Sequence, residues 1–492
     1  MQELLQSIVG EINEFFWGKL LIVLLVAAGL YFTFKLKFLQ VRMLKEMVRV
    51  LKEGKSGSSK DDISPFQAFA IGMAARVGTG NITGIAIAIA LGGPGAVFWM
   101  WIIAIISSAS SFVESTLAQV YKTKDKLGFR GGPSYYMEKG LKQRWMGVFF
   151  AILITITFGF IFNSVQSNTV TIAFENAFGT NRLTLGILMT IAFAVIIFGG
   201  VKRIAKMAEY KVMILAVLYI GVALFVVLIN ITKMPEVLSL IVKNAFGFQQ
   251  FAGGSIGAAL MHGTKRGLFS NEAGMGSAPN VAATATTSHP VKQGLIQAFG
   301  VLTDTLIVCT STAFIILLSD AYKQPGLSGI ALSQAALSQH IGSWASGCLA
   351  IFVFLFAFGA LIGNYYYGET NIQFLNSSKK WLLLYRLGAI AMVVFGSVAK
   401  VQLVWDLADL FMGLMVIVNL IAILWLSKIA FAALQDYMKQ KKAGLDPVFY
   451  KDSIEGLEGV ECWENRPAVS RTPEVQASGV TISHQSQRLE NV

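Results

Sequence analysis

The stretch Val77–Gly84 reads Val-Gly-Thr-Gly-Asn-Ile-Thr-Gly and lies inside a hydrophobic segment long enough to cross a membrane. A second long hydrophobic segment is interrupted at Gly263–Gly276, which reads Gly-Thr-Lys-Arg-Gly-Leu-Phe-Ser-Asn-Glu-Ala-Gly-Met-Gly. Lipid cannot satisfy freed backbone N–H and C=O groups, so irregular backbone at membrane depth must be buried in protein or line a water-filled cavity. Two such breaks in corresponding positions predict a binding site near the middle of the membrane.

Composition assigns the chain to the membrane proteins. Of its 492 residues, 54% are hydrophobic and only 14% are charged, and the mean hydropathy is +0.61. These values depart from the averages of soluble proteins, and one membrane span needs about 20 mostly apolar residues. We therefore predict an all-α polytopic membrane protein with eleven transmembrane helices, at about 17–34, 66–91, 94–120, 145–172, 183–200, 208–230, 246–285, 292–318, 344–375, 381–399 and 403–428.

The net charge of +12 reflects orientation in a membrane rather than a nucleic-acid partner. If the N-terminus is external, most Lys and Arg residues fall in the cytoplasmic connections, as the positive-inside rule requires. No aromatic-interleaved basic patch accompanies the charge. We expect a multi-pass protein of the cell (inner) membrane, with an external N-terminus, a cytoplasmic C-terminus, the lipid bilayer as its surroundings and no nucleic acid as a partner.

The two ends of the chain are interpreted separately from the spans. The first span is kept as a permanent helix, because its N-terminal flank carries Glu3, Glu11 and Glu14 where a cleaved signal peptide would be basic. From about Lys439 onward the chain turns polar and loses its hydrophobic periodicity. That pattern is typical of disorder, so we expect a largely disordered cytoplasmic tail.

The number of predicted spans indicates an internal repeat of five helices. Without the N-terminal helix ten spans remain, and the two broken spans are the first of each set of five. Odd-numbered repeats inserted in sequence must be inverted relative to each other, with ligands held where the broken helices meet. The expected domains are an N-terminal helix with a basic loop at 1–62, a first repeat at 63–230, an inverted second repeat at 244–430 and the tail at 431–492.

The first break has the chemistry to hold both an anion and a cation. Unwinding at Gly78–Asn81 leaves the N–H groups of the following half-helix free for a carboxylate, at the positive end of that helix dipole. The carbonyl groups near Ala74–Val77 then face a cation, and Asn81 adds an amide oxygen without a charge that is costly to bury. Close helix packing through small residues is the alternative. Packing alone does not require the interleaved polar residues Thr79, Asn81 and Thr83.

Four sequence motifs follow one another along the chain. They are Gly78-Thr79-Gly80-Asn81, the run Gly92–Trp101, the loop Arg130–Met137 and the run Arg266–Pro279. Together and in this order they resemble the alanine or glycine:cation symporter family, over residues 65 to 430. The family signature around Gly92–Trp101 usually ends in a glycine where this chain has Ser107.

The resemblance implies a leucine-transporter-type fold preceded by one extra helix. It also implies Na⁺-driven import of alanine, glycine or another small neutral amino acid by alternating access, and we expect a functional monomer. In that fold the backbone amides of the first break bind the substrate carboxylate, which implicates Thr79 and Gly80. The asparagine that follows contributes to a sodium site, which implicates Asn81.

A second sodium site is implied between the first break and the eighth core helix. The resemblance assigns it the carbonyl groups of Ala74 and Val77 and the stretch 359–364, with Asn364 as the side-chain ligand. Asp304 in the eighth span is a further candidate for a cation site, because ionisable groups inside membrane spans are functional hypotheses by default.

The fourth span carries a dense run of polar side chains between residues 163 and 171. Asn163, Gln166 and Ser167 stand at i, i+3 and i+4 and therefore share one helix face. Hydrogen bonds between helices, worth about 0.6 kcal/mol on average in one membrane protein, explain one or two such residues. Since the matching core helix lines the substrate pocket of the fold that the chain resembles, we predict Gln166 as a direct ligand. Asn163 and Asn168 are weaker candidates.

The second break adds further substrate-binding candidates. We expect Gly263 from its outer half-helix and Phe269 and Ser277 from its inner half. Phe269 is predicted to limit the size of the substrate side chain, because a bulky aromatic wall leaves room for little more than a methyl group. Ordinary apolar packing of Phe269 is the alternative.

Charged residues flank both breaks. Glu114 or Glu272 is expected to pair with Arg76 or Arg266 as a gate, or to cap backbone groups freed at the breaks. The structural role is the preferred interpretation.

Other classes of function lack their signatures. A channel would show a repeated filter or a charged ring, and an enzyme would show a nucleophile, base or metal cluster. The cysteines and histidines have no such spacing, and Cys309 is interpreted as a packing residue. We expect no enzymatic activity, no cofactor and Na⁺ as the coupling ion. The remaining alternative is a proton-coupled or exchanging amino-acid transporter of the same fold.

Overall fold

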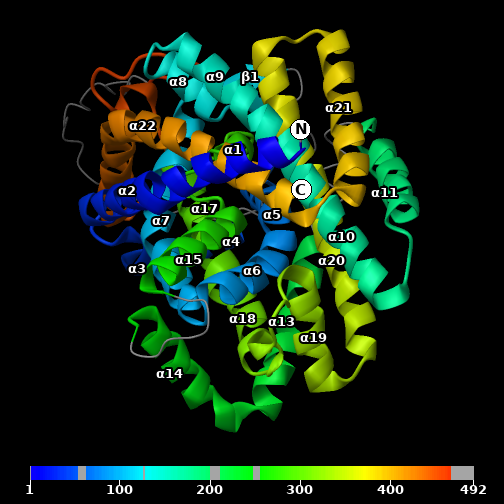
Figure 1. Cartoon of the computed structure of the whole chain (residues 1–492). Helices are drawn as coiled ribbons and strands as arrows, with labels where there is room; N and C mark the ends of the chain where they lie inside the picture. The colour runs from blue at the N-terminus through cyan, green and yellow to red at the C-terminus, as the bar shows by residue number, and fades with distance from the viewer. Residues whose placement is uncertain (1, 54–62, 126–127, 200–210, 248–254, 467–492) are drawn as a thin grey trace, which may run out of the picture.

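The computed structural model describes residues 2–53, 63–125, 128–199, 211–247 and 255–466. Helices dominate this part of the chain (Figure 1). Its one sheet is a short antiparallel hairpin of β1 (Thr123–Asp125) and β2 (Gly128–Arg130), with Thr123 opposite Arg130. The helical, multi-pass architecture predicted from the sequence is therefore confirmed.

Seven helices of the described residues are long and apolar enough to cross a membrane, or nine if each of two bent pairs is one span. The seven segments are Ile8–Lys35, Gly95–Val120, Arg144–Phe178, Pro290–Leu317, Trp344–Leu375, Lys379–Val398 and Val401–Lys442. The bent pairs are Pro65–Arg76 with Thr79–Gly92, and Ile214–Ile229 with Ile231–Ala245. Within the predicted spans at 183–200 and 246–285, the described residues form the shorter helices Arg182–Ile197 and Ile256–Asn271, of 16 residues each. Residues 200 and 248–254 of these spans lie outside the described residues.

The elements of the first part of the chain follow in order. They are α1 (Gln2–Phe15), the π-helical turn η1 (Phe16–Leu20), α2 (Leu21–Lys35), α3 (Leu39–Arg42), α4 (Leu44–Glu53), α5 (Pro65–Arg76), η2 (Thr79–Asn81), α6 (Thr83–Gly92), α7 (Gly95–Val120), α8 (Pro133–Lys139), α9 (Arg144–Ile154), η3 (Thr155–Phe162), α10 (Asn163–Phe178), α11 (Arg182–Ile197), α13 (Lys211–Ile229), η4 (Ile231–Lys233) and α14 (Met234–Ala245).

The second part begins with the other interrupted segment. It contains α15 (Ile256–Asn271), α16 (Ala278–Ala282), α17 (Pro290–Thr303), the π-helical turn η5 (Asp304–Cys309), α18 (Thr310–Leu317), η6 (Ala321–Lys323), α19 (Gly329–Ile341), α20 (Trp344–Leu375), α21 (Lys379–Val398), α22 (Val401–Lys442) and η7 (Lys451–Ser453).

The helices pack in two groups. In the first, α7 packs against α17 and α15, and α15 packs against α6. In the second, α10 packs against α20 and α21, and α11 packs against α21. Both broken segments belong to the first group, and α20 of the second group contacts α5. The breaks therefore lie where the two groups meet.

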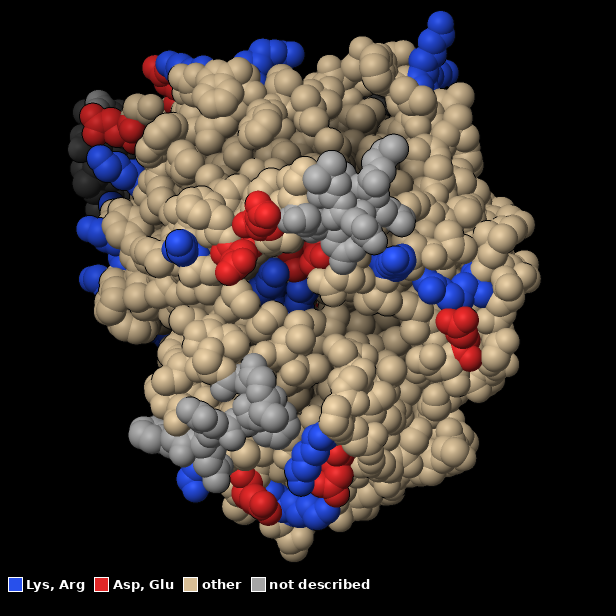
Figure 2. Space-filling view, in the orientation of Figure 1, with Lys and Arg blue, Asp and Glu red and all other residues tan. Residues whose placement is uncertain are grey.

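The N-terminal helices lie across the first group. α1 runs beside α22, and α2 packs against α7 (Figure 1). Most of the molecular face drawn in Figure 2 is uncharged, with charged side chains at its margins and around a central hollow. That distribution suits a protein surrounded by lipid.

The expected disorder of the tail is wrong for residues 431–466. α22 continues to Lys442, and the segment after it packs on the ends of other helices. The Phe449 N–H donates to the Ser288 carbonyl at 2.9 Å, and Trp463 Nε1 donates to the Gln119 carbonyl at 3.0 Å. These aromatic anchors order a polar stretch that composition alone assigns to disorder. Residues 467–492 of the predicted tail lie outside the described residues.

Candidate substrate and ion site

The first broken segment forms the centre of the candidate site. α5 ends at Arg76, and the chain resumes with η2 and α6 at a bend of 57°. Within the break, the Gly78 N–H donates to Asn81 Oδ1 at 3.0 Å. A side chain thus satisfies a backbone donor that a continuous helix would have paired with its own backbone. The predicted break at this position is confirmed.

Gln166 of α10 binds the break directly. Its Oε1 accepts the Thr79 N–H at 3.1 Å, and its side chain is buried. A Cβ on Gly78 would lie 3.0 Å from this oxygen and 3.0 Å from Ala360 Cβ, so glycine lets α10 and α20 approach the break. The structure therefore brings the predicted residues Thr79 and Gln166 together. It also shows that Gln166 occupies the amide expected to meet a substrate carboxylate.

A buried carboxylate lies against the break. Asp304, at the start of η5, accepts the Asn81 amide N–H at 2.6 Å and the Ser270 hydroxyl at 2.7 Å. The Thr312 hydroxyl donates to the Asn81 carbonyl at 2.7 Å, so the segment Pro290–Leu317 holds both the side chain and the backbone of this asparagine. Asp304 is fully buried, and its hydrogen-bond partners are neutral. An intramembrane carboxylate whose hydrogen-bond partners carry no charge is a candidate cation ligand.

Cys309 belongs to the same polar cluster. Its Sγ lies 3.0 Å from Ser270 Oγ and 3.4 Å from Asn81 Nδ2. Cys309 is buried in the core, as its interpretation as a packing residue implies, and the π-helical turn η5 also brings its Sγ to Asn81 and Ser270. Such turns are frequent at functional sites.

An aromatic stack covers the break on one side. A Cβ on Gly80 would lie 2.8 Å from the Phe269 ring, whose centroid is 4.6 Å from that of Phe162 and 4.8 Å from that of Trp405. The Arg266 guanidinium lies 4.6 Å from the Trp405 ring centroid. Phe269 therefore contacts the first break, as the middle ring of three, and its role as a wall for the substrate side chain stays a prediction.

Two cations share one carboxylate above this stack. Asp409 Oδ2 accepts Arg266 Nη2 at 2.6 Å and Lys265 Nζ at 2.8 Å, and all three side chains are at least nine-tenths buried. Nε and Nη1 of Arg266, Trp405 Nε1 and Asp409 Oδ1 find no hydrogen-bond partner within the described ranges. The cluster therefore retains free donors and one free acceptor next to the aromatic stack.

The second break begins later than the sequence predicts. α15 continues through Gly263 to Asn271, where Glu272 adopts φ of 58° and ends the helix. A Cβ on Gly263 would lie 2.4 Å from the Ala96 carbonyl oxygen, so this glycine serves close packing with α7. Gly263 thus lies outside the site, and Phe269 belongs to the outer half-helix rather than the inner one.

Glu114 of α7 holds the second break in place. Its carboxylate accepts the N–H groups of Gly274 and Gly276, each at 3.1 Å, and the Asn419 amide at 2.7 Å. The expected capping of freed backbone is therefore observed. Glu272 instead accepts the Ser277 hydroxyl at 2.5 Å, which places Ser277 at the second break.

Among the described residues Arg76 makes no direct ion pair with Glu114 or Glu272, although its charge acts on both carboxyl groups. Its guanidinium is buried, and no hydrogen bond to it is found in the described part of the chain. A Cβ on Gly300 would lie 2.4 Å from Arg76 Nη1, so a glycine of α17 makes room for the guanidinium.

The predicted second sodium site lies where α20 meets the end of α5. α20 packs closely on the end of α5, since a Cβ on Gly363 would lie 2.7 Å from Ala75 Cβ. Both polar atoms of the buried Asn364 side chain lack partners among the described residues. No donor from those residues reaches the carbonyl groups of Ala74 or Val77.

The two weaker candidates on α10 differ in their surroundings. Asn168 donates its amide to the carbonyl groups of Gly396 and Ala399, at 2.8 and 2.9 Å, and thereby fastens α10 to the end of α21. Asn163 donates to the Gly159 carbonyl at 3.0 Å, and its own Oδ1 is buried without a described partner. We retain Asn163 as a candidate and leave Asn168 out.

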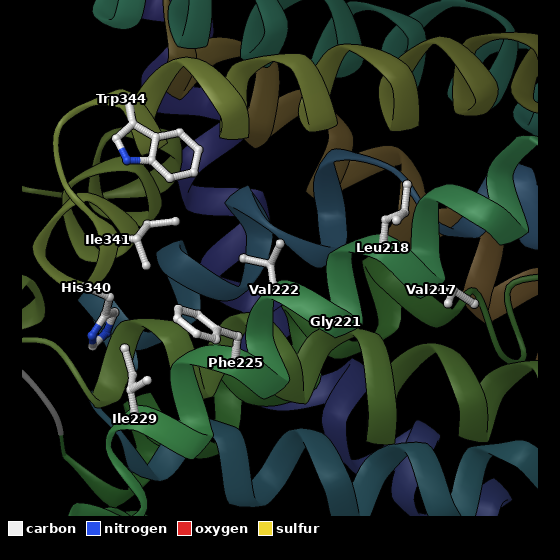
Figure 3. A pocket seen from close by; sticks show the side chains of 9 residues that line it. All are labelled: Val217, Leu218, Gly221, Val222, Phe225, Ile229, His340, Ile341 and Trp344. Atoms are coloured by element: carbon white, nitrogen blue, oxygen red, sulfur yellow. The ribbon is translucent and has the colours of Figure 1, made fainter.

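A separate apolar groove lies at α13, away from the breaks (Figure 3). It has a volume of about 710 Å³ and runs between α13, the end of α19 and the start of α20. Val217, Leu218 and Phe225 line it and are more than half exposed. These apolar surfaces suit contact with lipid and do not belong to the candidate site.

The sequence did not indicate Trp405, Asp409 or Asn419 as parts of either break. All three lie in the last apolar span, and their partners are far away in the chain. An acidic residue and an asparagine inside an apolar span were the available signals.

Comparison with protein families places the chain. The sequence model of the Sodium:alanine symporter family matches residues 1–451 of this chain. The chain belongs to this family. Its members are sodium-coupled amino-acid symporters, so the resemblance inferred from the four motifs is confirmed, with Na⁺ as the coupling ion.

Three named relatives are similar to this chain over nearly its whole length. The "Probable sodium/glutamine symporter GlnT" of Bacillus subtilis (strain 168) is 75% identical, over 94% of this chain and 97% of that protein. The "Amino-acid carrier protein AlsT" of the same organism is 54% identical, over 94% and 99%. The "Putative sodium/proton-dependent alanine carrier protein YrbD", also from Bacillus subtilis, is 44% identical, over 93% and 97%.

Among solved structures, the chain is similar to the manganese transporter of Eremococcus coleocola. The TM-score is 0.48 at 14% identity, over 78% of this chain and 81% of that one.

Proposed function

We propose that this symporter imports a neutral amino acid together with Na⁺, and that glutamine is its main substrate. The observation that carries the proposal is the buried Asp304 carboxylate, which is held by Asn81 and Ser270 directly against the first break. The backbone amides on one side of the break suit the carboxylate of a neutral amino acid. The Asp304 carboxylate on the other side suits a monovalent cation.

The first sodium position lies at Asn81 and Asp304 in this proposal. Asn81 Oδ1 already accepts the Gly78 N–H, and an amide oxygen retains a second lone pair for a cation. Asp304 supplies the negative charge, and the hydroxyl oxygens of Ser270 and Thr312 lie in the same cluster. Oxygen ligands of this kind suit a hard cation.

The second sodium position lies between the end of α5 and α20. Its proposed ligands are the carbonyl groups of Ala74 and Val77 and the side chain of Asn364. Support comes from the buried Asn364 amide, which has no other described partner. An unsatisfied polar group at membrane depth is costly, so a ligand there stabilises the structure.

The substrate carboxylate is proposed to meet the Gly80 amide and to displace Gln166 Oε1 from the Thr79 N–H, which Gln166 holds in the structure described here. The substrate side chain then points toward the ring of Phe269. Trp405 Nε1 and Arg266 offer unpaired donors next to that ring, and a carboxamide oxygen satisfies such donors whereas a methyl group does not. The relative named for glutamine, at 75% identity, supports the same choice.

Alanine and glycine, which the sequence analysis expected, are the second candidates. The contact between Phe269 and Gly80 favours them, because it leaves little room in the structure described here. For either substrate, we propose that rocking of the first helix group about the two breaks exposes the site alternately to each side.

The proposed architecture keeps eleven spans. It adds α11, the bent pairs at residues 65–92 and 214–245, and the α15–α16 segment to the seven long helices. Support comes from the two breaks, which open the proposed repeats at 63–230 and 244–430. We further propose a monomer in the cell (inner) membrane with its N-terminus outside.

Proton coupling is the second candidate mechanism. The buried carboxyl groups of Asp304 and Glu272 are places where a proton can replace a sodium ion. A relative named as sodium/proton-dependent points in the same direction.

Binding of labelled glutamine and alanine to the purified protein tests the site assignment. We expect binding in sodium chloride and none in choline chloride, with glutamine displacing alanine. Asn81→Ala and Asn364→Ala should raise the Na⁺ concentration for half-maximal binding, because each loses a proposed oxygen ligand. Asn168→Ala, a buried asparagine outside the site, is the matched control. Unchanged Na⁺ dependence in the first two variants would remove both assignments.

A further inference from the structure

The extra N-terminal helix reaches the candidate site through one side chain. Trp17 is fully buried, and its Nε1 donates to the Asp409 carbonyl oxygen at 3.2 Å. Its ring lies 5.6 Å from Lys265 Nζ. One turn earlier, Asn13 donates to the Asp406 carbonyl at 2.8 Å. The N-terminal helix thus binds the α22 backbone at Asp406 and at Asp409, one turn apart.

The local geometry of the N-terminal helix singles out this contact. Trp17 lies in the π-helical turn η1, and such turns occur mostly as single insertions, frequently at functional sites. On the opposite helix, a Cβ on Gly413 would lie 2.7 Å from Leu21 Cδ1 and 3.8 Å from Trp17 Nε1. A wider turn on one helix and a glycine on the other therefore bring Trp17 onto α22.

The same contact leads inward to the aromatic stack. Lys265 and Arg266 share Asp409 Oδ2, and Arg266 in turn lies on the Trp405 ring. Trp405 packs on Phe269, which touches the first break at Gly80. A continuous series of contacts therefore runs from Trp17 to the proposed substrate site.

Lys265 competes with Arg266 for a single carboxylate oxygen. A cation over an aromatic face is attracted by the ring quadrupole, most strongly for Trp and when water is excluded. Trp17 contacts both partners on the Lys265 side of this competition, since its ring lies near Lys265 Nζ and its N–H donates to the Asp409 backbone.

We infer that Trp17 is a positioning residue that holds the Arg266–Trp405 stack closed over the substrate. This inference rests on the proposed function. It assigns the extra helix a role in controlling access to the site, and not only a place in the packing of the molecule. The Trp17 side chain itself does not touch the substrate.

Uptake kinetics in proteoliposomes separate this role from simple packing. In Trp17→Leu, which loses both the ring and the N–H donor, the KM for external substrate should rise by up to about 30-fold, the factor that corresponds to losing one cation–π contact from which water is excluded. Vmax should be retained, because the site and the sodium positions are intact. Trp17→Phe keeps a ring for Lys265 and should show a smaller rise, and it also serves if Trp17→Leu folds poorly. Phe15→Leu, at a neighbouring exposed position, is the control.

A double-mutant cycle that combines the Trp17 variants with Lys265→Met tests whether Trp17 acts through Lys265. If Trp17 acts through Lys265 and Asp409, the two changes should not add, because contacting residues couple. Independent, additive effects on KM, or a loss of Vmax alone, would overturn the inference. If the wild-type protein takes up neither glutamine nor alanine, the proposed function fails and the inference with it. Normal wild-type uptake with an unchanged KM in both Trp17 variants removes the inference alone.

Discussion

Gly80 shows how a missing side chain shapes the site. An added Cβ would lie 2.8 Å from the Phe269 ring, so the first break and the aromatic stack fit together only around glycine. Gly78 has the same role toward Gln166 of α10. The spacing of these glycines therefore sets which side chains face the break, and the polar residues between them supply its chemistry.

Replacing Phe269 tests whether the aromatic ring limits substrate size. Phe269→Ala removes the middle ring of the stack and should admit larger neutral amino acids, with a shift in relative uptake of about tenfold or more, which corresponds to about 1.4 kcal/mol. A Phe-to-Ala change in a core also costs about 3–5 kcal/mol of stability. Thermal unfolding should therefore be measured beside competition by amino acids of increasing size. Selectivity identical to that of the wild type would leave Phe269 with a packing role only.

The sequence predicted the residues whose signal is local. Thr79, Asn81 and Gln166 are polar groups inside apolar helices, which packing does not require, and the structure brings all three to the break. Trp405 and Cys309 carry no such signal, because both are ordinary residues of an apolar helix. Their roles depend on which helix lies opposite, and that follows from tertiary packing.

The second break illustrates the same limit at the level of an element. Gly263 and Gly267 suggested that the helix ends there, yet both face α7 at close range within an unbroken α15. The helix ends at Glu272, and the loop beyond it contains Gly274 and Gly276 with φ of 79° and 84°. Glu114, from another helix, satisfies the N–H groups of both glycines. Because a residue of another helix stabilises this break, the local sequence alone does not predict where the helix ends.

Gly276→Ala should damage the second break selectively. A left-handed conformation costs a non-glycine residue roughly 1–2 kcal/mol, and the new Cβ would lie 2.7 Å from Phe150 and 2.8 Å from Pro133. We expect a lower midpoint of thermal unfolding and reduced uptake by the protein that remains folded. The matched control is Gly221→Ala on α13, where nothing lies within 4 Å and φ is not positive. Equal stability of the two variants would contradict the described geometry of the break.

At the scale of the whole molecule, the segment after α22 ties together several helix ends. Phe449 and Trp463 anchor it, and Lys142 and Lys292 pair with Glu458 and Asp446. His289, just before α17, is buried against the ring of Phe449. Its Nδ1 accepts the Val291 N–H at 3.2 Å. The neutral imidazole is therefore part of the contact between this segment and the helices.

This contact should weaken in mild acid. Burial lowers the pKa of His289 below its usual value, and the hydrogen bond to Asp436 offsets only part of that effect. A histidine with a lowered folded pKa adds stability above the unfolded pKa of about 6.5, and that stability is lost as the pH falls below it. Going from about pH 7.5 to about pH 5.5 should therefore reduce hydrogen-exchange protection of residues 443–466, after correction for intrinsic rates.

His289→Gln supplies the control for this pH effect. The amide does not titrate, so protection of residues 443–466 should become independent of pH in this range. A pH dependence of equal size in this variant would assign the effect to other groups, and constant protection in the wild type would contradict the role of His289.

Uptake of labelled glutamine by proteoliposomes under imposed gradients tests the central claim most directly. An inward Na⁺ gradient at equal pH should drive accumulation, and an inward proton gradient without Na⁺ should not. Alanine should be taken up in the same way but should compete less well than glutamine. Accumulation driven by the proton gradient alone would contradict sodium coupling at Asn81 and Asp304.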